Sequence, residues 1–208
     1  KNVTCQRLDL ILSKKKTILI TGHTAGLGFA CCDLLSRHGY AIEGISRSTG
    51  HDLLTKYDDV RRYIIESDPD IFINNAYVAE KQTNLLIALF QEWRFKEKMI
   101  INIGSVASLI PKGHPDYAMP YAQEKRTQRN FCQQNNFNFS KRDFETIKCK
   151  LTNINFDYIK TDFPSKHDKS KYPNLLPLEA AEIIQYVVDG FEKNICFREI
   201  TAHSNKVI

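Results

Sequence analysis

The chain has 208 residues, of which 42% are hydrophobic and 25% are charged, and its formal net charge is +5. These values suit one globular domain with a real core, and they exclude disordered, collagen-like and disulfide-dense chains. Because the Lys and Arg residues are scattered and no apolar run approaches the roughly 20 residues of a membrane helix, we expect neither a nucleic-acid partner nor a membrane anchor. The irregularly spaced cysteines are typical of reduced thiols in a cytoplasmic protein.

Short apolar runs, typical of strands buried on both faces, alternate with longer stretches of helical spacing. The expected elements are strand 17–21, helix 26–38, strand 40–46, helix 56–66, strand 70–74, helix 83–95, strand 99–103, helix 120 to about 134, strand 149–155, helix 178–191 and strand 195–202. This alternation predicts βαβ units with right-handed crossovers. We therefore expect an α/β fold, a single Rossmann-like domain over residues 1–208. Its doubly wound parallel sheet would lie in a three-layer α/β/α arrangement.

The first expected strand runs directly into the turn T-G-H-T-A-G-L-G, and a helix follows. Free N–H groups and the helix dipole attract anions to such a helix start, and glycine lets the backbone approach a phosphate. The general G-x-G-x-x-G fingerprint is not met, because Thr24 and Leu27 stand where it requires glycine. A glycine-rich turn that binds nothing is the alternative. The residues expected at the phosphates are Gly22, His23, Thr24, Gly26, Leu27 and Gly28.

Two further features carry acid–base chemistry. Tyr121 and Lys125 lie four positions apart at the start of an expected helix, so they share a helix face. A neighbouring ammonium favours the phenolate and lowers the tyrosine pKa, which is ordinarily about 10. Ser105 follows a strand at the sheet edge where open α/β folds bind ligands, and its hydroxyl could hold a substrate oxygen. The alternatives are a surface Tyr/Lys pair and a serine that caps a turn.

Together and in this order, T-G-x-x-x-G-x-G, Ser105 and Tyr121-x-x-x-Lys125 resemble the short-chain dehydrogenase/reductase family. The resemblance covers about residues 17–162. Asn74-Asn75-Ala76 corresponds to the family's N-N-A-G, which lies beside the cofactor. Asp52-Leu53 stands where the family's Asp meets the adenine. Thr161 stands where a family threonine contacts the nicotinamide amide.

The resemblance implies the roles of the catalytic residues. Tyr121 would be the general acid in reduction and the base in oxidation, Lys125 would lower its pKa and bind the nicotinamide ribose, and Ser105 would position the carbonyl. The family's fourth catalytic residue is an Asn, and Asn84 is the best match. An N-cap at the start of its helix is the alternative for Asn84.

The end of the second expected strand favours NADP(H) over NAD(H). NAD-specific sites place an acidic residue there, on the ribose 2′-hydroxyl. Here Ser46 takes that position and Arg47 follows, and a hydroxyl with a guanidinium suits a 2′-phosphate. Glu43, the rival acid, lies three residues too early. We expect His23 and Ser48 to approach the phosphate as well, and a merely solvated Arg47 is the alternative.

The chain departs from the family pattern at three places. Tyr77 replaces the glycine of N-N-A-G, and we expect its ring to narrow the site or to stack on a ligand. Phe156-Asp157 replaces a Pro-Gly pair, so Asp157 is expected to need an unusual backbone conformation. The substrate loop, about residues 163–176, is short. In the loop before Tyr121, His114 and Tyr117 could contact substrate.

The resemblance implies hydride transfer between NADP(H) and a small carbonyl or alcohol substrate. It also implies a homodimer or homotetramer built on the Tyr-bearing helix and the helix before it. No metal is expected, because no His, Cys, Asp or Glu cluster has ligand spacing. Two alternatives stay open. One is a non-catalytic NADP(H)-binding sensor or scaffold, and the other is a sugar-nucleotide-modifying relative, against which the short C-terminal part counts.

Overall fold

The structure is a computed structural model that describes residues 16–136, 147–161 and 174–205. Within these residues, six parallel strands form one sheet in the order β2-β1-β3-β4-β5-β6. The strands are β1 (Thr17–Thr21), β2 (Ala41–Ile45), β3 (Ile71–Asn74), β4 (Met99–Ser105), β5 (Lys150–Phe156) and β6 (Glu199–Ala202).

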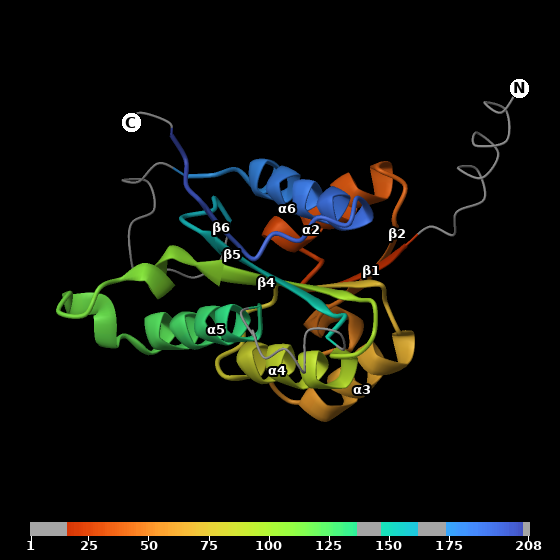
Figure 1. The fold of residues 1–208 in the computed structure, drawn as a ribbon, viewed down its shortest axis with the longest axis horizontal. Helices are drawn as coiled ribbons and strands as arrows, with labels where there is room; N and C mark the ends of the chain where they lie inside the picture. Colours follow the sequence, from red (N-terminus) through yellow and green to blue (C-terminus); the bar gives the residue numbers. More distant parts are fainter. Residues whose placement is uncertain (1–15, 137–146, 162–173, 206–208) are drawn as a thin grey trace, which may run out of the picture.

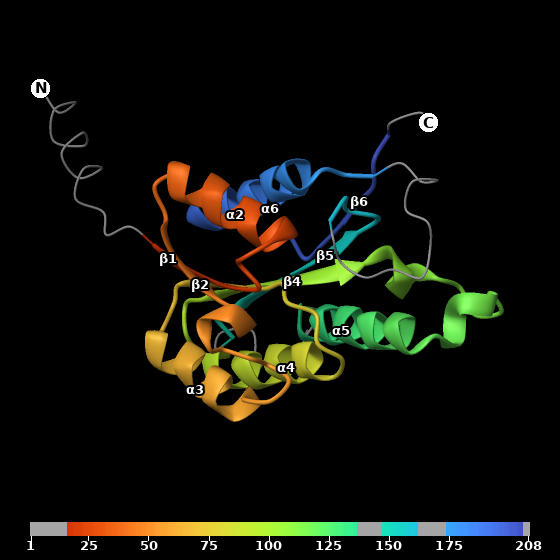
Figure 2. The ribbon, with the colours of Figure 1, turned by 180° about the vertical axis from the view of Figure 1, so that it is seen from behind.

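Helices cover both faces of this sheet, as Figures 1 and 2 show from opposite sides. Helices α2 and α6 lie on one face, and α3, α4 and α5 lie on the other. The helices are α2 (Gly26–Arg37), α3 (Tyr57–Ser67), α4 (Lys81–Trp93), α5 (Pro120–Asn136) and α6 (Pro177–Glu192). The predicted three-layer α/β/α fold is therefore confirmed for the described residues.

The inner strands β1, β3, β4 and β5 are buried on both faces, because successive side chains point to opposite sides of the sheet, and helices cover both sides. In β1, Ile18 and Ile20 join the core under α2 and α6, while Leu19 joins the core under α3 and α4. In β3, Ile73 and Phe72 divide in the same way. This explains why the strands appear in the sequence as continuous apolar runs rather than as an apolar/polar alternation.

The strand order creates a switch point between β1 and β3. The chain leaves β1 toward β2 on one side, then returns across the sheet to β3 on the other. Connections that diverge in this way leave a crevice outside the carboxyl ends of the two strands, where ligands bind in open α/β sheets. The turn after β1 and the β3–α4 connection (residues 75–80) form this crevice.

The expected elements match the observed ones within a few residues at each end. Helix α4 begins at Lys81 rather than at residue 83, and β4 extends to Ser105. Among the described residues, no helix is both long and apolar enough to cross a membrane.

Candidate functional site

The glycine-rich turn brings strand β1 very close to the start of α2. Gly22 and Gly26 have φ values of +74° and +55°, which glycine adopts at little cost. A methyl group on Gly28 would lie 2.2 Å from the Gly22 carbonyl oxygen, so only glycine fits there. The turn therefore holds the first-turn amides of α2 at the switch point, where an anion would meet them.

The β3–α4 connection is tied to the same turn. The Thr21 hydroxyl accepts hydrogen bonds from the backbone N–H groups of Asn75 (3.0 Å) and Ala76 (2.9 Å). The Asn75 side-chain amide donates to the Thr21 carbonyl at 2.8 Å. These contacts tie Asn75 and Ala76 to the glycine-rich turn.

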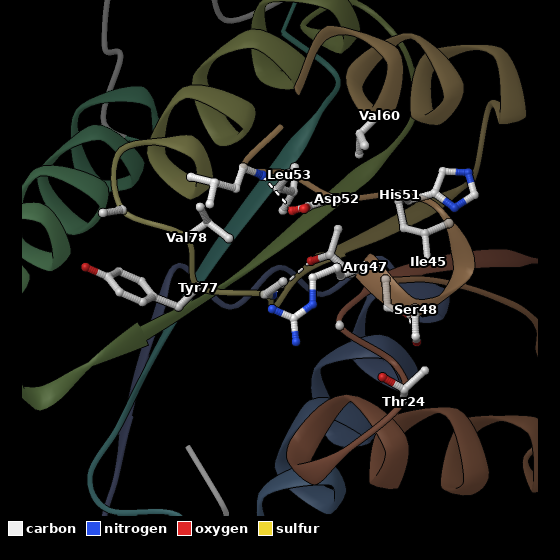
Figure 3. Close-up of a pocket in the computed structure, with 16 residues that line it drawn as sticks. Thr24, Ile45, Arg47, Ser48, His51, Asp52, Leu53, Val60, Tyr77 and Val78 are labelled. Atoms are coloured by element: carbon white, nitrogen blue, oxygen red, sulfur yellow. Dashed lines mark hydrogen bonds between the residues drawn. The ribbon is translucent and has the colours of Figure 1, made fainter. Parts of the chain in front are cut away.

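A cavity of about 470 Å³ opens between this turn, the end of β2 and the β3–α4 connection (Figure 3). Its lining contains most of the predicted cofactor-binding residues: Gly22, Thr24, Ser46, Arg47, Ser48, Asp52, Leu53, Ala76 and Tyr77. Sequence reasoning missed the lining residues Thr21, Ile45, His51, Leu54, Val60, Val78 and Ala79. Most of these are ordinary strand, loop and helix residues that carry no motif, so only the fold reveals them.

At the end of β2, the cavity is lined by polar and cationic groups. Ser46 and Ser48 have their hydroxyl oxygens 3.0 Å apart. Arg47 is exposed, and among the described residues its guanidinium has no hydrogen bond or ion pair. Glu43 points elsewhere, because its carboxylate accepts a hydrogen bond from the Tyr63 hydroxyl and it does not line the cavity. The residue that could read a 2′-substituent is thus a free cation rather than an anion.

Two predicted cofactor residues have other contacts. The Asp52 carboxylate accepts from the Leu54 N–H (2.9 Å) and the Thr55 hydroxyl (3.1 Å), so it caps the turn before α3 while lining the cavity. The structure does not place His23 in the cavity wall. The His23 ring packs against Gly44 of β2, where a methyl group would lie 2.2 Å from it, and the ring fills the space that the missing side chain leaves.

Tyr121 and Ser105 meet at the carboxyl end of β4. Pro120 starts α5, and Tyr121 lies in its first turn. Burial raises the pKa of Tyr121 above its ordinary value, a hydrogen bond with Ser105 offsets part of this rise, and the charge of Glu124 adds to it. The Ser105 hydroxyl also accepts from the Ala107 N–H at 3.2 Å. Ser105 therefore caps a turn and contacts Tyr121 at once.

Lys125 is almost completely buried below Tyr121, with 3% of its surface exposed. Its ammonium donates to the Gln82 side chain (2.7 Å), the Ile103 carbonyl (2.9 Å) and the Gln128 side chain (3.3 Å). Three acceptors match the three N–H donors of the ammonium group. Burial lowers the pKa of Lys125 to about 7, although the charge of Glu124 opposes this shift.

The prediction that Asn84 joins the catalytic group is not supported by its position. Asn84 is exposed on α4, and its backbone N–H already bonds the Glu80 carbonyl, so it is not the N-cap either. The reason is that α4 begins earlier than expected, which turns Asn84 outward and Gln82 inward. Gln82 is fully buried and bonds Lys125, and no family motif marked it.

Tyr77 lies against the same pair. Its ring and the Tyr121 ring meet edge to face with centroids 5.0 Å apart, and the Lys125 ammonium is 5.3 Å from the Tyr77 centroid. The Tyr77 hydroxyl donates to the Glu124 carboxylate at 3.1 Å. Burial and this carboxylate raise the pKa of Tyr77 to about 12, so the phenol stays protonated.

Three further expectations from the sequence concern Thr161, Asp157 and the substrate loop. Thr161 lies beside the glycine-rich turn, since a methyl group on Gly26 would be 3.0 Å from its Cγ2. The expectation of an unusual backbone at Asp157 is wrong, because its φ is not positive and its N–H bonds the Ala202 carbonyl at 3.0 Å. The substrate loop, residues 163–176, lies outside the described residues except for its last three positions.

The two loop residues that were candidates for substrate contact have local partners. The His114 imidazole accepts from the Asp116 N–H at 3.1 Å, and the Tyr117 ring lies 3.9 Å from the Arg126 guanidinium. Within ranges 16–136, 147–161 and 174–205, no group of three or more His, Cys, Asp or Glu residues could hold a metal ion.

No protein-family model and no curated protein sequence matches the chain. Solved structures do. A short-chain dehydrogenase/reductase from Vibrio parahaemolyticus aligns with a TM-score of 0.69 at 17% identity, over 91% of this chain and 100% of that one. A 3-ketoacyl-(acyl-carrier-protein) reductase from Brucella melitensis, complexed with NADH, aligns with a TM-score of 0.68 at 16% identity, over 93% and 98% of the two chains.

An alcohol dehydrogenase from the archaeon Thermococcus sibiricus, complexed with 5-hydroxy-NADP, aligns with a TM-score of 0.67 at 16% identity, over 94% of this chain and 99% of that chain. The chain thus has the fold of the short-chain dehydrogenases/reductases. The resemblance drawn from the motifs is confirmed at the level of the fold.

Proposed function

We propose that this chain is an NADP(H)-dependent oxidoreductase that transfers a hydride between the nicotinamide and a small carbonyl or alcohol, with Tyr121 as the general acid or base. The observation that carries the proposal is that Ser105 and Tyr121 lie together at the carboxyl end of β4, with buried Lys125 beside the Tyr121 ring, across the β3–α4 connection from a cavity of nucleotide size. Two of the similar structures are complexes with NADH or 5-hydroxy-NADP, which supports a nicotinamide cofactor here.

The adenosine end of such a cofactor fits the residues present. The turn at Gly22 and Gly28 admits no side chain, so a diphosphate could reach the backbone there. Leu53 and Val60 offer apolar surface to a base, and Arg47 offers its guanidinium to a 2′-phosphate. The fit at the nicotinamide end is less complete, because the donors of Lys125 are all engaged by protein acceptors.

When bound, the cofactor would supply or accept the hydride. The Tyr121 hydroxyl would donate its proton to the substrate oxygen in reduction and accept it back in oxidation, and the Ser105 hydroxyl would hold that oxygen in place. Because the pKa of Tyr121 is raised, the phenol is protonated at neutral pH, which favours the reductive direction. Below pH about 7 the buried Lys125 adds a positive charge that stabilises the phenolate.

A non-catalytic NADP(H)-binding protein of the same fold is the second candidate. The engaged donors of Lys125 and the Tyr77 ring beside it favour this candidate. Single-turnover hydride transfer with a panel of carbonyl compounds separates the two functions. Nothing in the described residues favours a sugar-nucleotide-modifying activity. A homodimer or homotetramer and a cytoplasmic location remain predictions.

The cofactor preference is tested by titrating the wild type and Arg47→Ser with NADPH and NADH, following nicotinamide fluorescence. We expect the wild type to prefer NADPH by about ten-fold or more, because the guanidinium forms a charge-assisted bond to the 2′-phosphate. Arg47→Ser should lose this preference while NADH binding stays within about two-fold.

Arg62→Ser, on the exposed face of α3 and outside the cavity, is the matched control. Equal binding of both nucleotides to the wild type would refute Arg47 as the phosphate reader and leave the rest of the proposal standing. Binding of neither nucleotide would contradict the proposed function.

A further inference from the structure

The Glu124 carboxylate accepts hydrogen bonds from three groups in the β3–α4 connection and the start of α4. One carboxylate oxygen accepts the Glu80 N–H (3.0 Å) and the Thr83 hydroxyl (2.9 Å), and the other accepts the Tyr77 hydroxyl (3.1 Å). Hydrogen bonds to a charged acceptor are among the stronger ones in proteins. Glu124 thus holds this connection in one conformation against helix α5.

The held conformation contains backbone strain. Glu80 has a φ of +61°, in the left-handed region that side chains other than glycine seldom adopt. Such strain persists only where the surroundings impose it, and Glu124 bonds the N–H of this very residue. Releasing Glu124 would therefore let the connection relax, and Tyr77 would relax with it.

The Tyr77 ring stands between the cavity and the reactive residues. Tyr77 belongs to the cavity lining, and its phenol is directed away from Arg47 and His51 at one end of that lining (Figure 3). On its other side the ring meets Tyr121 edge to face at 5.0 Å. The cavity lining contains neither Ser105, Tyr121 nor Lys125.

A dinucleotide with its adenosine in the cavity must pass Tyr77 to bring its other half to Tyr121. In the conformation held by Glu124 the ring would lie in this path, since it joins the cavity lining and meets Tyr121, and the donors of Lys125 are engaged by protein acceptors. The adenosine half meets no such obstacle, since it would bind between the phosphate-binding turn and Arg47.

We propose that Tyr77 is a specificity-determining residue. While its hydroxyl is bonded to Glu124, a contact that we call the latch, its ring closes the passage from the adenosine cavity to Tyr121. The site then binds an adenosine phosphate readily, and it binds a whole dinucleotide only when the latch opens. The inference deepens the proposed function and rests on it, because the ligand is the proposed cofactor. Opening the latch costs free energy, and this cost lowers the apparent affinity for the dinucleotide alone.

The test is calorimetric titration with two ligands, NADPH and adenosine 2′,5′-bisphosphate, which is its adenosine half. We expect the wild type to bind NADPH at most about three-fold more tightly than the half ligand. Tyr77→Gly removes the ring and should raise the ratio of NADPH affinity to half-ligand affinity by about ten-fold, whatever contact the half ligand itself makes with Tyr77. Tyr77→Phe keeps the ring but frees it from Glu124, and should give an intermediate gain.

Tyr63→Phe is the matched control, because it removes another tyrosine–glutamate hydrogen bond, to Glu43, outside the cavity. Half-ligand binding also reports that each variant is folded. If the wild type already binds NADPH ten-fold more tightly than the half ligand and the Tyr77 variants keep that ratio, the inference is overturned and the proposed function stands. If neither ligand binds the wild type, the proposed function fails and the inference fails with it.

Discussion

The pKa of Tyr121 depends on its surroundings as well as on its own phenol group. Burial alone would leave it a weak acid, and the Ser105 hydroxyl is the group that offsets part of this effect. Lys125 sits below the ring, 5.6 Å from its centroid, and its lowered pKa of about 7 limits the pH range over which it carries a charge. The three residues named by the family motif thus meet in space, although Lys125 donates to protein acceptors.

The role of Tyr121 is tested by Tyr121→Phe. We expect turnover of a carbonyl substrate to fall by about 100-fold or more, because the phenol proton is lost from the transition state. NADPH binding should stay within about two-fold, since the ring remains. Steady-state kinetics and nicotinamide fluorescence measure the two quantities.

Tyr186→Phe, at an exposed tyrosine of α6 whose ring lies beside Phe197 and outside the cavity, serves as the control and should turn over normally. Near-normal turnover in Tyr121→Phe itself would mean that another group supplies the proton.

At the scale of elements, the first half of helix α5 rests on a polar layer, while Cys132 near its end joins the apolar core. Its buried positions include Lys125 and Gln128, and Gln128 bonds both Asn102 of β4 (3.2 Å) and Thr83 of α4 (3.0 Å). Beneath it, asparagines on three adjacent strands bond in a row. The row runs from Asn74 to Asn102 (3.0 Å) and from Asn102 to Asn153 (2.8 Å).

Such a layer is stable because nearly every buried group has a partner, and it fixes the register of α5 through specific bonds. Lys125 is the member of this layer that lowers the stability of the folded state when it is charged, since its ammonium is then buried and bonded only to neutral acceptors. Its ordinary pKa is 10.5 and its pKa in the folded chain is about 7. Between these values the unfolded chain binds more protons than the folded chain, so this residue makes the folded state more stable as pH rises.

We therefore expect the free energy of unfolding of the wild type to rise more steeply with pH than that of Lys125→Met, between about pH 7 and about pH 8.5. The difference in slope should approach about 1.4 kcal/mol per pH unit. Urea unfolding at several pH values measures it, and the buried thiols contribute equally to both proteins. Parallel slopes would show that Lys125 keeps an ordinary pKa in the folded chain.

At the scale of the whole molecule, the switch point between β1 and β3 decides where function can lie. The glycine-rich turn, Arg47, the β3–α4 connection and Tyr121 come from separate parts of the chain and meet at the carboxyl ends of the strands. The solvent-exposed surface of helix α5 bears on the predicted oligomer. The exposed residues of α5 include Gln123, Thr127 and Asn130, all of them polar.

Obligate subunit interfaces are rich in apolar surface, and this face of α5 is not. If the chain forms the predicted homodimer through α4 and α5, we expect a dimer that dissociates on dilution. Light scattering over a concentration series from about 100 μM to about 1 μM should show the mean mass falling toward that of a monomer. A constant monomer mass would rule out the predicted oligomer, and a constant dimer mass would contradict the polar interface.

Much of this protein could be predicted from its sequence by itself. Continuous apolar runs and glycine positions determine the strands, the helices and the tight turn after β1, because local periodicity and backbone freedom are properties of neighbouring residues. Ser105, Tyr121 and Lys125, singled out by their order and spacing, lie together in the structure, and Arg47, singled out by its place after β2, lines the cavity.

The tertiary structure decided what depends on contacts between distant residues. The sequence placed the start of α4 two residues too late, and it assigned to the site Asn84, whereas Gln82 is the residue that bonds Lys125. The His23 ring, expected at the phosphates, packs against Gly44 of β2. The acceptors of Lys125 and the hold of Glu124 on Tyr77 join segments some 40 residues apart in the chain. Packing sets these partners, and no local pattern encodes them.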